Sequence, residues 1–228
     1  MTNVLEAVVF DFDGLIIDSE WVIFETALAA FAAHGHDLTI EAWSTIVGTN
    51  DKNDPDWWTR LCSAVGITAF DRADYDAAYE AQDRSNRDEL PVLPGVLDLV
   101  AALEAARVPL GIASSSSRSW LDRHLGRLGL EGRFGALIGA DLVGGVGKPA
   151  PDVYLRACAD LGADPVRSVA IEDSAHGVSA ARAAGMAVVA VPSRVTRFND
   201  FTHADLVVGS LTELGLADLA ALLDEHPR

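Results

Sequence analysis

The stretch Val4-Leu5-Glu6-Ala7-Val8-Val9-Phe10-Asp11-Phe12-Asp13-Gly14 is an apolar run that ends in two aspartates and a glycine. The run predicts a buried β-strand, and the glycine allows the chain to turn away at its end. Two carboxylates at one strand end repel each other and are costly to bury. We therefore expect Asp11 and Asp13 to bind a cation, transfer a proton or form a covalent bond.

Composition limits the possible partners of the 228-residue chain. Half of the residues are hydrophobic, which is enough for a large core, and the net charge of −17 would repel nucleic acids and anionic membranes. Cys62 and Cys158 are the only cysteines, so the chain is no disulfide scaffold. The start has no signal-peptide pattern and no apolar run is long enough to span a membrane. We expect a cytoplasmic protein; the oligomeric state stays open, and a monomer is plausible.

Short apolar runs alternate with segments of helical period along most of the chain. This pattern predicts an α/β fold with a doubly wound, Rossmann-like parallel sheet, which binds ligands at the carboxyl ends of its strands. Glycines at 129, 162 and 185 mark expected helix ends. The later predicted strands cover residues 108–113, 136–138, 168–171, 187–191 and 206–208.

One block breaks the alternation. Residues 16–91 are almost entirely helical in pattern and contain four of the five tryptophans. We interpret 16–91 as a helical insert in an α/β core formed by 1–15 and 92–228, with the segment 88–95 as the return linker.

Four polar clusters follow predicted strands. Because the carboxyl ends of parallel strands share one edge of the sheet, we expect all four to face one crevice. They are Asp11 with Asp13, the serines 114–117, Lys148, and Glu172 with Asp173.

The residue types in these clusters suit one chemistry. Carboxylates are the hard oxygen ligands that Mg²⁺ prefers. A hydroxyl can hold phosphate oxygens, and an ammonium offsets the charge of a phosphate and of a carboxylate nucleophile. We expect Ser114, which lies nearest its strand, to have this role, and Ser115, Ser116 and Ser117 to cap the next helix.

The four motifs, in this order and spacing, resemble the haloacid dehalogenase superfamily over nearly the whole chain. The subgroup they resemble contains β-phosphoglucomutases and sugar phosphatases with a helical cap. The resemblance implies that 16–91 is this cap and that 1–15 and 92–228 form the α/β catalytic core. The matching residues are Asp11-Phe12-Asp13-Gly14-Leu15-Ile16-Ile17-Asp18-Ser19-Glu20, Ala113-Ser114, Gly147-Lys148-Pro149-Ala150-Pro151-Asp152 and Glu172-Asp173-Ser174-Ala175-His176-Gly177.

The resemblance implies a role for each catalytic residue. Asp11 would be the nucleophile that forms an aspartyl-phosphate, and Asp13 the general acid and base. Ser114 would bind the phosphoryl group, and Lys148 would steady it together with Asp11.

The resemblance also implies a Mg²⁺ site. Asp11, the main-chain carbonyl of Asp13, and Asp173 would hold the ion. Glu172 would be either a further ligand or a partner of the ligands.

Departures from the family pattern separate the possible activities. Metal-independent dehalogenases lack the second aspartate, which is present here as Asp13. The mutase histidine aligns with Ile23, its lysine and asparagine align with Ser117 and Arg118, and its substrate-phosphate arginine has no clear counterpart in 48–53. Because a mutase must hold a second phosphate, these departures favour a phosphatase.

The sequence therefore predicts a Mg²⁺-dependent phosphatase that hydrolyses a small phosphorylated metabolite, such as a sugar phosphate. The alternatives are a β-phosphoglucomutase-type mutase and, more remotely, a phosphoacceptor signalling domain, which shares the fold and the acidic cluster. The substrate and the cap residues that select it stay open.

Overall fold

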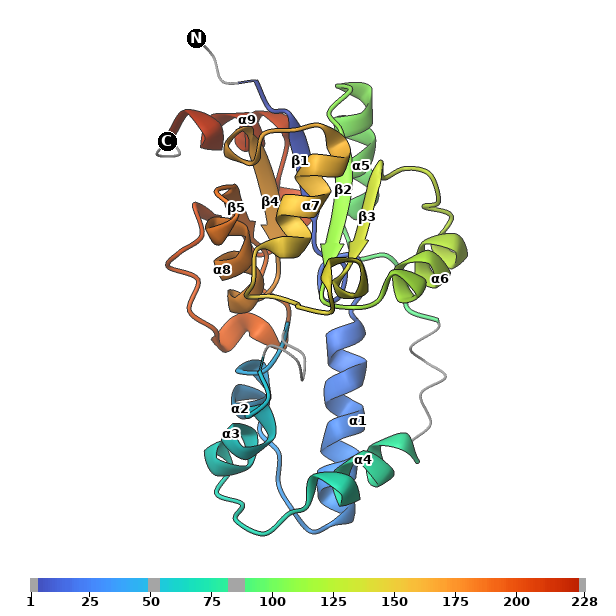
Figure 1. Cartoon of the computed structure of the whole chain (residues 1–228), viewed down its shortest axis with the longest axis vertical. Coiled ribbons are helices and arrows are strands. Elements are labelled where there is room, and N and C mark those ends of the chain that lie inside the picture. The colour runs from blue at the N-terminus through green and yellow to red at the C-terminus, as the bar shows by residue number, and fades with distance from the viewer. Residues whose placement is uncertain (1–3, 49–53, 82–88, 226–228) are drawn as a thin grey trace.

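The computed structural model describes residues 4–48, 54–81 and 89–225 (Figure 1). Within these residues, six parallel strands form one sheet in the order β3-β2-β1-β4-β5-β6. The first strand in the sequence is central, which is the arrangement of a doubly wound sheet, and the expected fold class is confirmed. The strands are β1 Ala7–Phe10, β2 Leu110–Ser114, β3 Ala136–Gly139, β4 Ser168–Glu172, β5 Ala187–Ala190 and β6 Leu206–Val207.

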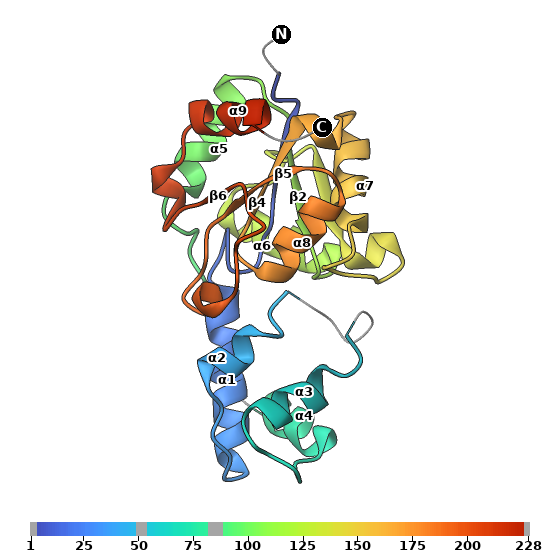
Figure 2. The same cartoon turned by 90° about the vertical axis from the view of Figure 1, so that its left-hand side faces the viewer.

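Helices cover both faces of the sheet because successive side chains of each strand point to opposite sides. Val8 and Phe10 belong to the apolar cluster that includes residues of α5 (Val96–Ala105), α6 (Arg118–Leu128) and α9 (Leu216–Glu225). Val9 belongs to the cluster on α7 (Asp152–Leu161) and α8 (Ala175–Ala183). Figure 2 shows α5 and α9 on one side of the sheet and α7 and α8 on the other.

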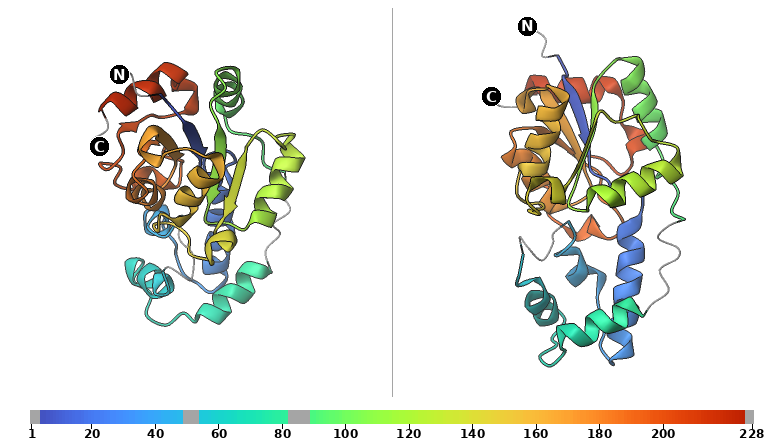
Figure 3. Two further views of the ribbon diagram at one scale, coloured as in Figure 1. Left: turned by 45° about the horizontal axis from the view of Figure 1, so that its top comes forward. Right: turned by 45° about the vertical axis from the view of Figure 1, so that its right-hand side comes forward.

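The cap segment lies at the end of the core toward which the strands point (Figures 1 and 3). Its apolar cluster includes the aromatic residues Phe31, Trp43 and Tyr75. This cluster is distinct from those on the two faces of the sheet, and Val195 of the core also belongs to it. Its helices are α1 Ser19–Ala33, α2 Ile40–Ser44, α3 Trp57–Ala64 and α4 Arg72–Glu80.

Two strands begin later than the sequence pattern suggests. β1 starts at Ala7, since the apolar run begins outside the core: Val4 is 66% exposed. β2 starts at Leu110, after Pro109, which has no N–H to donate to a ladder. The predicted helix ends at Gly129 and Gly162 are confirmed, since both adopt positive φ after the last helical residue.

The limits of the cap stay a prediction. Ile16 and Ile17, placed in the cap by the sequence pattern, are buried in the core cluster. Residues 49–53, which weighed against a mutase, and Asp88 of the linker lie outside the described residues. No helix in the described ranges is long and apolar enough to cross a membrane.

Candidate active site

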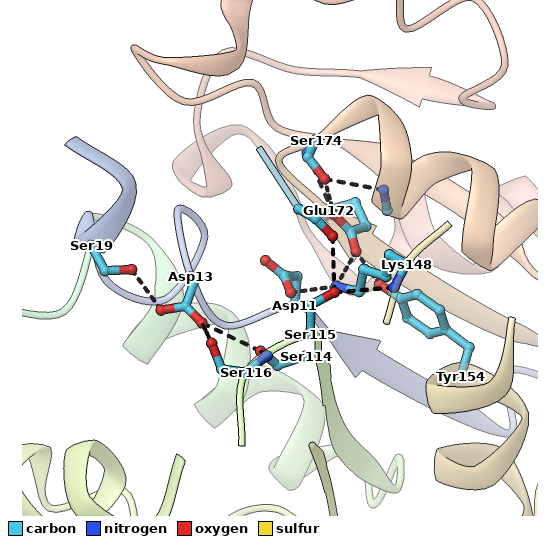
Figure 4. A network of polar contacts seen from close by, with 12 residues as sticks. Asp11, Asp13, Ser19, Ser114, Ser115, Ser116, Lys148, Tyr154, Glu172 and Ser174 are labelled. Carbon is cyan, nitrogen blue, oxygen red and sulfur yellow. Dashed lines mark hydrogen bonds and ion pairs between the residues drawn. The ribbon is translucent and has the colours of Figure 1, made fainter. Parts of the chain in front are cut away.

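The four polar clusters meet at one edge of the sheet. Asp11, Ser114 and Glu172 lie at the carboxyl ends of β1, β2 and β4, which are neighbours in the sheet. The main chain of Asp11 stays paired to β4, because its N–H donates to the carbonyl of Ile171 at 2.9 Å. Lys148 reaches the same place from the loop between β3 and α7, as Figure 4 shows.

Lys148 is buried between two carboxylates. Its Nζ forms ion pairs with Oδ1 of Asp11 and, at 2.5 Å, with Oε1 of Glu172. The Tyr154 hydroxyl donates to the same Glu172 oxygen. Burial acts to lower the pKa of Lys148, but the charges of Asp11 and Glu172 outweigh it and raise that pKa. The lysine is therefore held as a cation against Asp11.

The acidic side of the site carries more negative charge than Lys148 balances. Burial is the largest influence on Asp11 and raises its pKa to about 8, although the Lys148 ammonium opposes the shift. Burial, followed by the charges of Asp11 and Glu172, raises the pKa of Asp173 well above its usual value. Both carboxylates would ionise more easily beside a further cation.

The donor set fits a small divalent cation. One carboxylate oxygen each from Asp11, Glu172 and Asp173 lie within 4.8 Å of one another, and all three residues are buried. Oxygen-only ligands of this kind suit Mg²⁺. Both oxygens of Glu172 already have protein partners, since Oε2 lies 3.3 Å from the Ser174 hydroxyl. This favours Glu172 as a partner of the ligands, the second of the two roles expected for it.

The turn after Asp13 packs directly on the candidate metal site. Gly14 has a φ of +86°, and a Cβ atom built on it would lie 2.2 Å from Oδ2 of Asp173. Only glycine combines this backbone conformation with this close approach.

The Asp13 carboxylate lies in a separate set of contacts. Its Oδ1 accepts hydrogen bonds from the Ser19 hydroxyl at 2.6 Å and from Nε1 of Trp120 at 3.0 Å. Its Oδ2 accepts from the Ser116 and Ser114 hydroxyls at 2.7 and 3.3 Å (Figure 4). Donors from the cap, the serine loop and α6 therefore meet at this one side chain.

The serine loop differs in part from the prediction. Ser117 caps α6 as expected, but Ser115 and Ser116 do not. The Ser115 hydroxyl donates to the Gly48 carbonyl of the cap at 2.9 Å and accepts from the Lys148 N–H at 3.1 Å. Capping uses only the residue next to the helix, so the preceding hydroxyls are available for tertiary contacts.

A cavity of about 380 Å³ lies between the core and the cap. On the core side, Asp11, Asp13 and Asp173 line it together with Lys148 and Ser114. The cap side is mainly apolar but contains two charged side chains; it is formed by Glu20, Ile23, Trp43, Ile46, Val47, Gly48, Trp57 and Arg72. The cavity can therefore hold a small polar ligand against the carboxylates.

Sequence reasoning missed several of these residues. Ser116 and Trp120 contact Asp13, yet nothing in their spacing indicated it. Arg72 lines the cavity and lies 4.4 Å over the Trp57 ring, a contact between separate cap helices. Trp57 itself also lines the cavity.

The protein has a doubly wound core with carboxylates, a serine and a lysine at one edge of the sheet, and a helical cap next to them. This arrangement defines a class of capped hydrolases. Residues 5–185 match the haloacid dehalogenase-like hydrolase family, and the chain belongs to that family. The expected enzyme class, a phosphatase of this family, is confirmed.

Three similar proteins illustrate the relationship. Hexitol phosphatase B of Escherichia coli is 35% identical over 218 residues, covering 93% of this chain and 96% of that protein. The crystal structure of CbbY from Rhodobacter sphaeroides with xylulose-(1,5)bisphosphate has a TM-score of 0.72 at 27% identity and covers 94% of this chain and 99% of that one. β-Phosphoglucomutase from Clostridium difficile has a TM-score of 0.75 at 23% identity, covers 97% and 98% of the two chains, and shares the fold.

Proposed function

We propose that this enzyme is a Mg²⁺-dependent phosphatase that hydrolyses a small phosphorylated metabolite of the sugar-phosphate kind through an aspartyl-phosphate on Asp11. The observation that carries the proposal is the ion pair between Asp11 and the buried Lys148, both of which line the cavity. The names of hexitol phosphatase B and of the xylulose bisphosphate complex of CbbY support a substrate of this kind.

In the first step, a carboxylate oxygen of Asp11 attacks phosphorus and the bond to the ester oxygen breaks. Asp13 gives its proton to the departing alkoxide, and the Lys148 ammonium offsets charge on the phosphoryl oxygens. The Ser114 hydroxyl, at the end of β2, would hold one of these oxygens.

In the second step, a water molecule attacks the same phosphorus and the bond to Asp11 breaks. Asp13, now ionised, accepts the proton from this water. Inorganic phosphate leaves, and Asp11 returns as a carboxylate.

Asp11, Asp173 and the main-chain carbonyl of Asp13 would hold Mg²⁺, with Glu172 supporting them. A bound Mg²⁺ neutralises phosphoryl charge and keeps the carboxylates ionised.

The test is turnover of a panel of sugar phosphates with Mg²⁺, measured as released inorganic phosphate. Asp11→Asn removes the nucleophilic oxygen but keeps the shape, so turnover should be abolished while the fold is retained. Excess chelator should abolish turnover by the wild type, and added Mg²⁺ should restore that turnover.

Asp152→Asn is the matched control, because Asp152 is an exposed carboxylate in the first turn of α7. It should keep wild-type activity. Activity retained by Asp11→Asn would contradict the nucleophile, and undiminished turnover in chelator would contradict the metal.

One observation bears on the mutase alternative. A mutase must bind a second phosphate, which would need a cation on the cap. Among the described residues that line the cavity, Arg72 is the only such cation, and it keeps the mutase as the second candidate. Phosphorus NMR of the reaction separates the two: a mutase moves the phosphate within the sugar, whereas a phosphatase accumulates inorganic phosphate.

A further inference from the structure

The contact between Asp13 and Trp120 lies outside the cavity. Trp120 is in the first turn of α6, and its Nε1–H donates to Oδ1 of Asp13 at 3.0 Å. Trp120 does not line the cavity that Asp13 lines. The indole therefore contacts the carboxylate without lining the cavity.

Packing holds this indole in place. The Trp120 ring lies against the ring of His124, one helical turn later, with centroids 3.9 Å apart. His124 is fully buried, and its ring centroid lies 6.2 Å from that of Phe12, the residue between the two aspartates. The direction of the indole N–H is thus set by α6 and by the loop that carries Asp13.

The other donors to Asp13 have less directional constraint. Ser19, Ser114 and Ser116 all donate through hydroxyls, which rotate to suit their acceptors. An indole has a single N–H in the plane of a rigid ring. Of the four side chains that bond to Asp13, Trp120 is therefore the one that can orient the carboxylate.

We propose that Trp120 is a positioning residue that orients the Asp13 carboxyl group for proton transfer to the leaving group. The inference rests on the proposed function, in which Asp13 is the general acid. Misplacing a catalytic group by about 1 Å can cost about 100-fold in rate. Since three hydroxyls remain on Asp13, we expect loss of the indole bond to cost about tenfold.

The test uses Trp120→Phe, which retains an aromatic ring for His124 but has no N–H. The measured quantity is kcat/KM, which reports the first phosphoryl transfer, for two substrates. A sugar phosphate has an alkoxide leaving group that must be protonated, whereas the p-nitrophenolate of p-nitrophenyl phosphate leaves without a proton. We expect about a tenfold loss on the sugar phosphate and less than a twofold loss on p-nitrophenyl phosphate.

Trp58→Phe is the matched control, because Trp58 packs in the aromatic core of the cap against Phe31 and Tyr75. Any effect it has should be equal for the two substrates. If Trp120→Phe does not fold, Trp120→Met fills the space with a flexible apolar chain and should show the same selective loss.

A second arm combines Trp120→Phe with Asp13→Asn in single-turnover assays. If Trp120 acts through Asp13, it should have no further effect once the carboxylate is gone. Equal losses on both substrates, no loss on the sugar phosphate, or additive effects in the double variant would overturn the inference. A wild type that hydrolyses neither ester would instead overturn the proposed function.

Discussion

Asp11, Lys148 and Glu172 form a buried group in which one ammonium lies between two carboxylates. Burying charged groups is costly unless they are paired and hydrogen-bonded, and the Tyr154 hydroxyl adds one such bond to Glu172. With Asp173 beside them, the carboxylates still outnumber the cation. The site is therefore organised to receive a further positive charge.

This excess charge predicts the pH dependence of stability without metal. The pKa of Asp11 is about 8 in the folded protein, mainly through burial, and its ordinary value is 3.8. A carboxyl group with a raised pKa favours the fold below its ordinary pKa, and this contribution is lost as pH rises through the folded value. Asp173 shifts in the same direction.

In chelator, we therefore expect Tm to fall between about pH 4 and pH 8, and Mg²⁺ to oppose the fall. Asp11→Asn should be more stable than the wild type at pH 8 in chelator, with a smaller difference at pH 5. Thermal unfolding of both proteins at the two pH values measures this. If Asp11→Asn and the wild type differ more in Tm at pH 5 than at pH 8, the raised pKa assigned to Asp11 is contradicted.

Among the elements, β4 and α8 approach each other closely at the site. β4 ends in Glu172, and Ser174 caps α8 by accepting from the Gly177 N–H at 3.1 Å. Gly177 lies against the Glu172 side chain, because an added Cβ would be 1.9 Å from its carboxylate oxygen Oε2. Glu172 cannot move aside easily, since Lys148 and Tyr154 hold it.

Gly177→Ala should therefore destabilise the protein although alanine is the better helix former. Helix propensity favours alanine by about 1 kcal/mol, whereas overpacking a buried site typically costs about 1–3 kcal/mol and displaces neighbours. We expect a net loss in the free energy of unfolding by urea, together with reduced phosphatase activity.

Ser179→Ala in the same helix is the control, because Ser179 is exposed and its hydroxyl donates to the Ala175 carbonyl one helical turn earlier. It should leave both quantities nearly unchanged. If the two variants behave alike, Glu172 is not confined by Gly177.

In the molecule as a whole, the cap and the core meet through Val195, a core residue in the apolar cluster of the cap, and through several polar contacts. Nδ2 of Asn199 donates to the Ser44 carbonyl of α2 at 3.1 Å, and Nδ1 of His176 lies 3.0 Å from the Val47 carbonyl. The cavity lies between the cap and the core, so we expect these polar contacts to affect its closure.

Asn199→Ala should thus affect substrate binding more than stability. Losing a hydrogen bond of about 1 kcal/mol would lower the population of the docked cap, and KM would rise by up to about fivefold with little change in Tm. Steady-state kinetics and thermal unfolding measure the two effects.

Arg156→Ala, which removes an exposed ion pair with Asp160 on α7, is the control and should change neither quantity. A fall in Tm without a rise in KM would show that the Asn199 contact supports the fold and not the docking of the cap.

The amino-acid sequence alone was enough to predict the sheet and the strand-end clusters. Apolar runs such as 168–171 carry their strand signal locally, and parallel strands bring their ends to one edge. Asp11, Ser114 and Glu172 could therefore be placed together from the sequence pattern. Lys148 was predicted as a further member of these clusters, and its role came from the resemblance to the family.

The side chains that complete the site depend on the tertiary fold. Ser116, Trp120 and Arg72 come from a loop and two helices whose sequence patterns report burial and helical period but not contacts across the fold. Whether a serine caps a helix or contacts an aspartate depends on distances set by packing of distant segments. The two aspartates that follow the first strand were therefore predictable, whereas the group that orients the second of them was not.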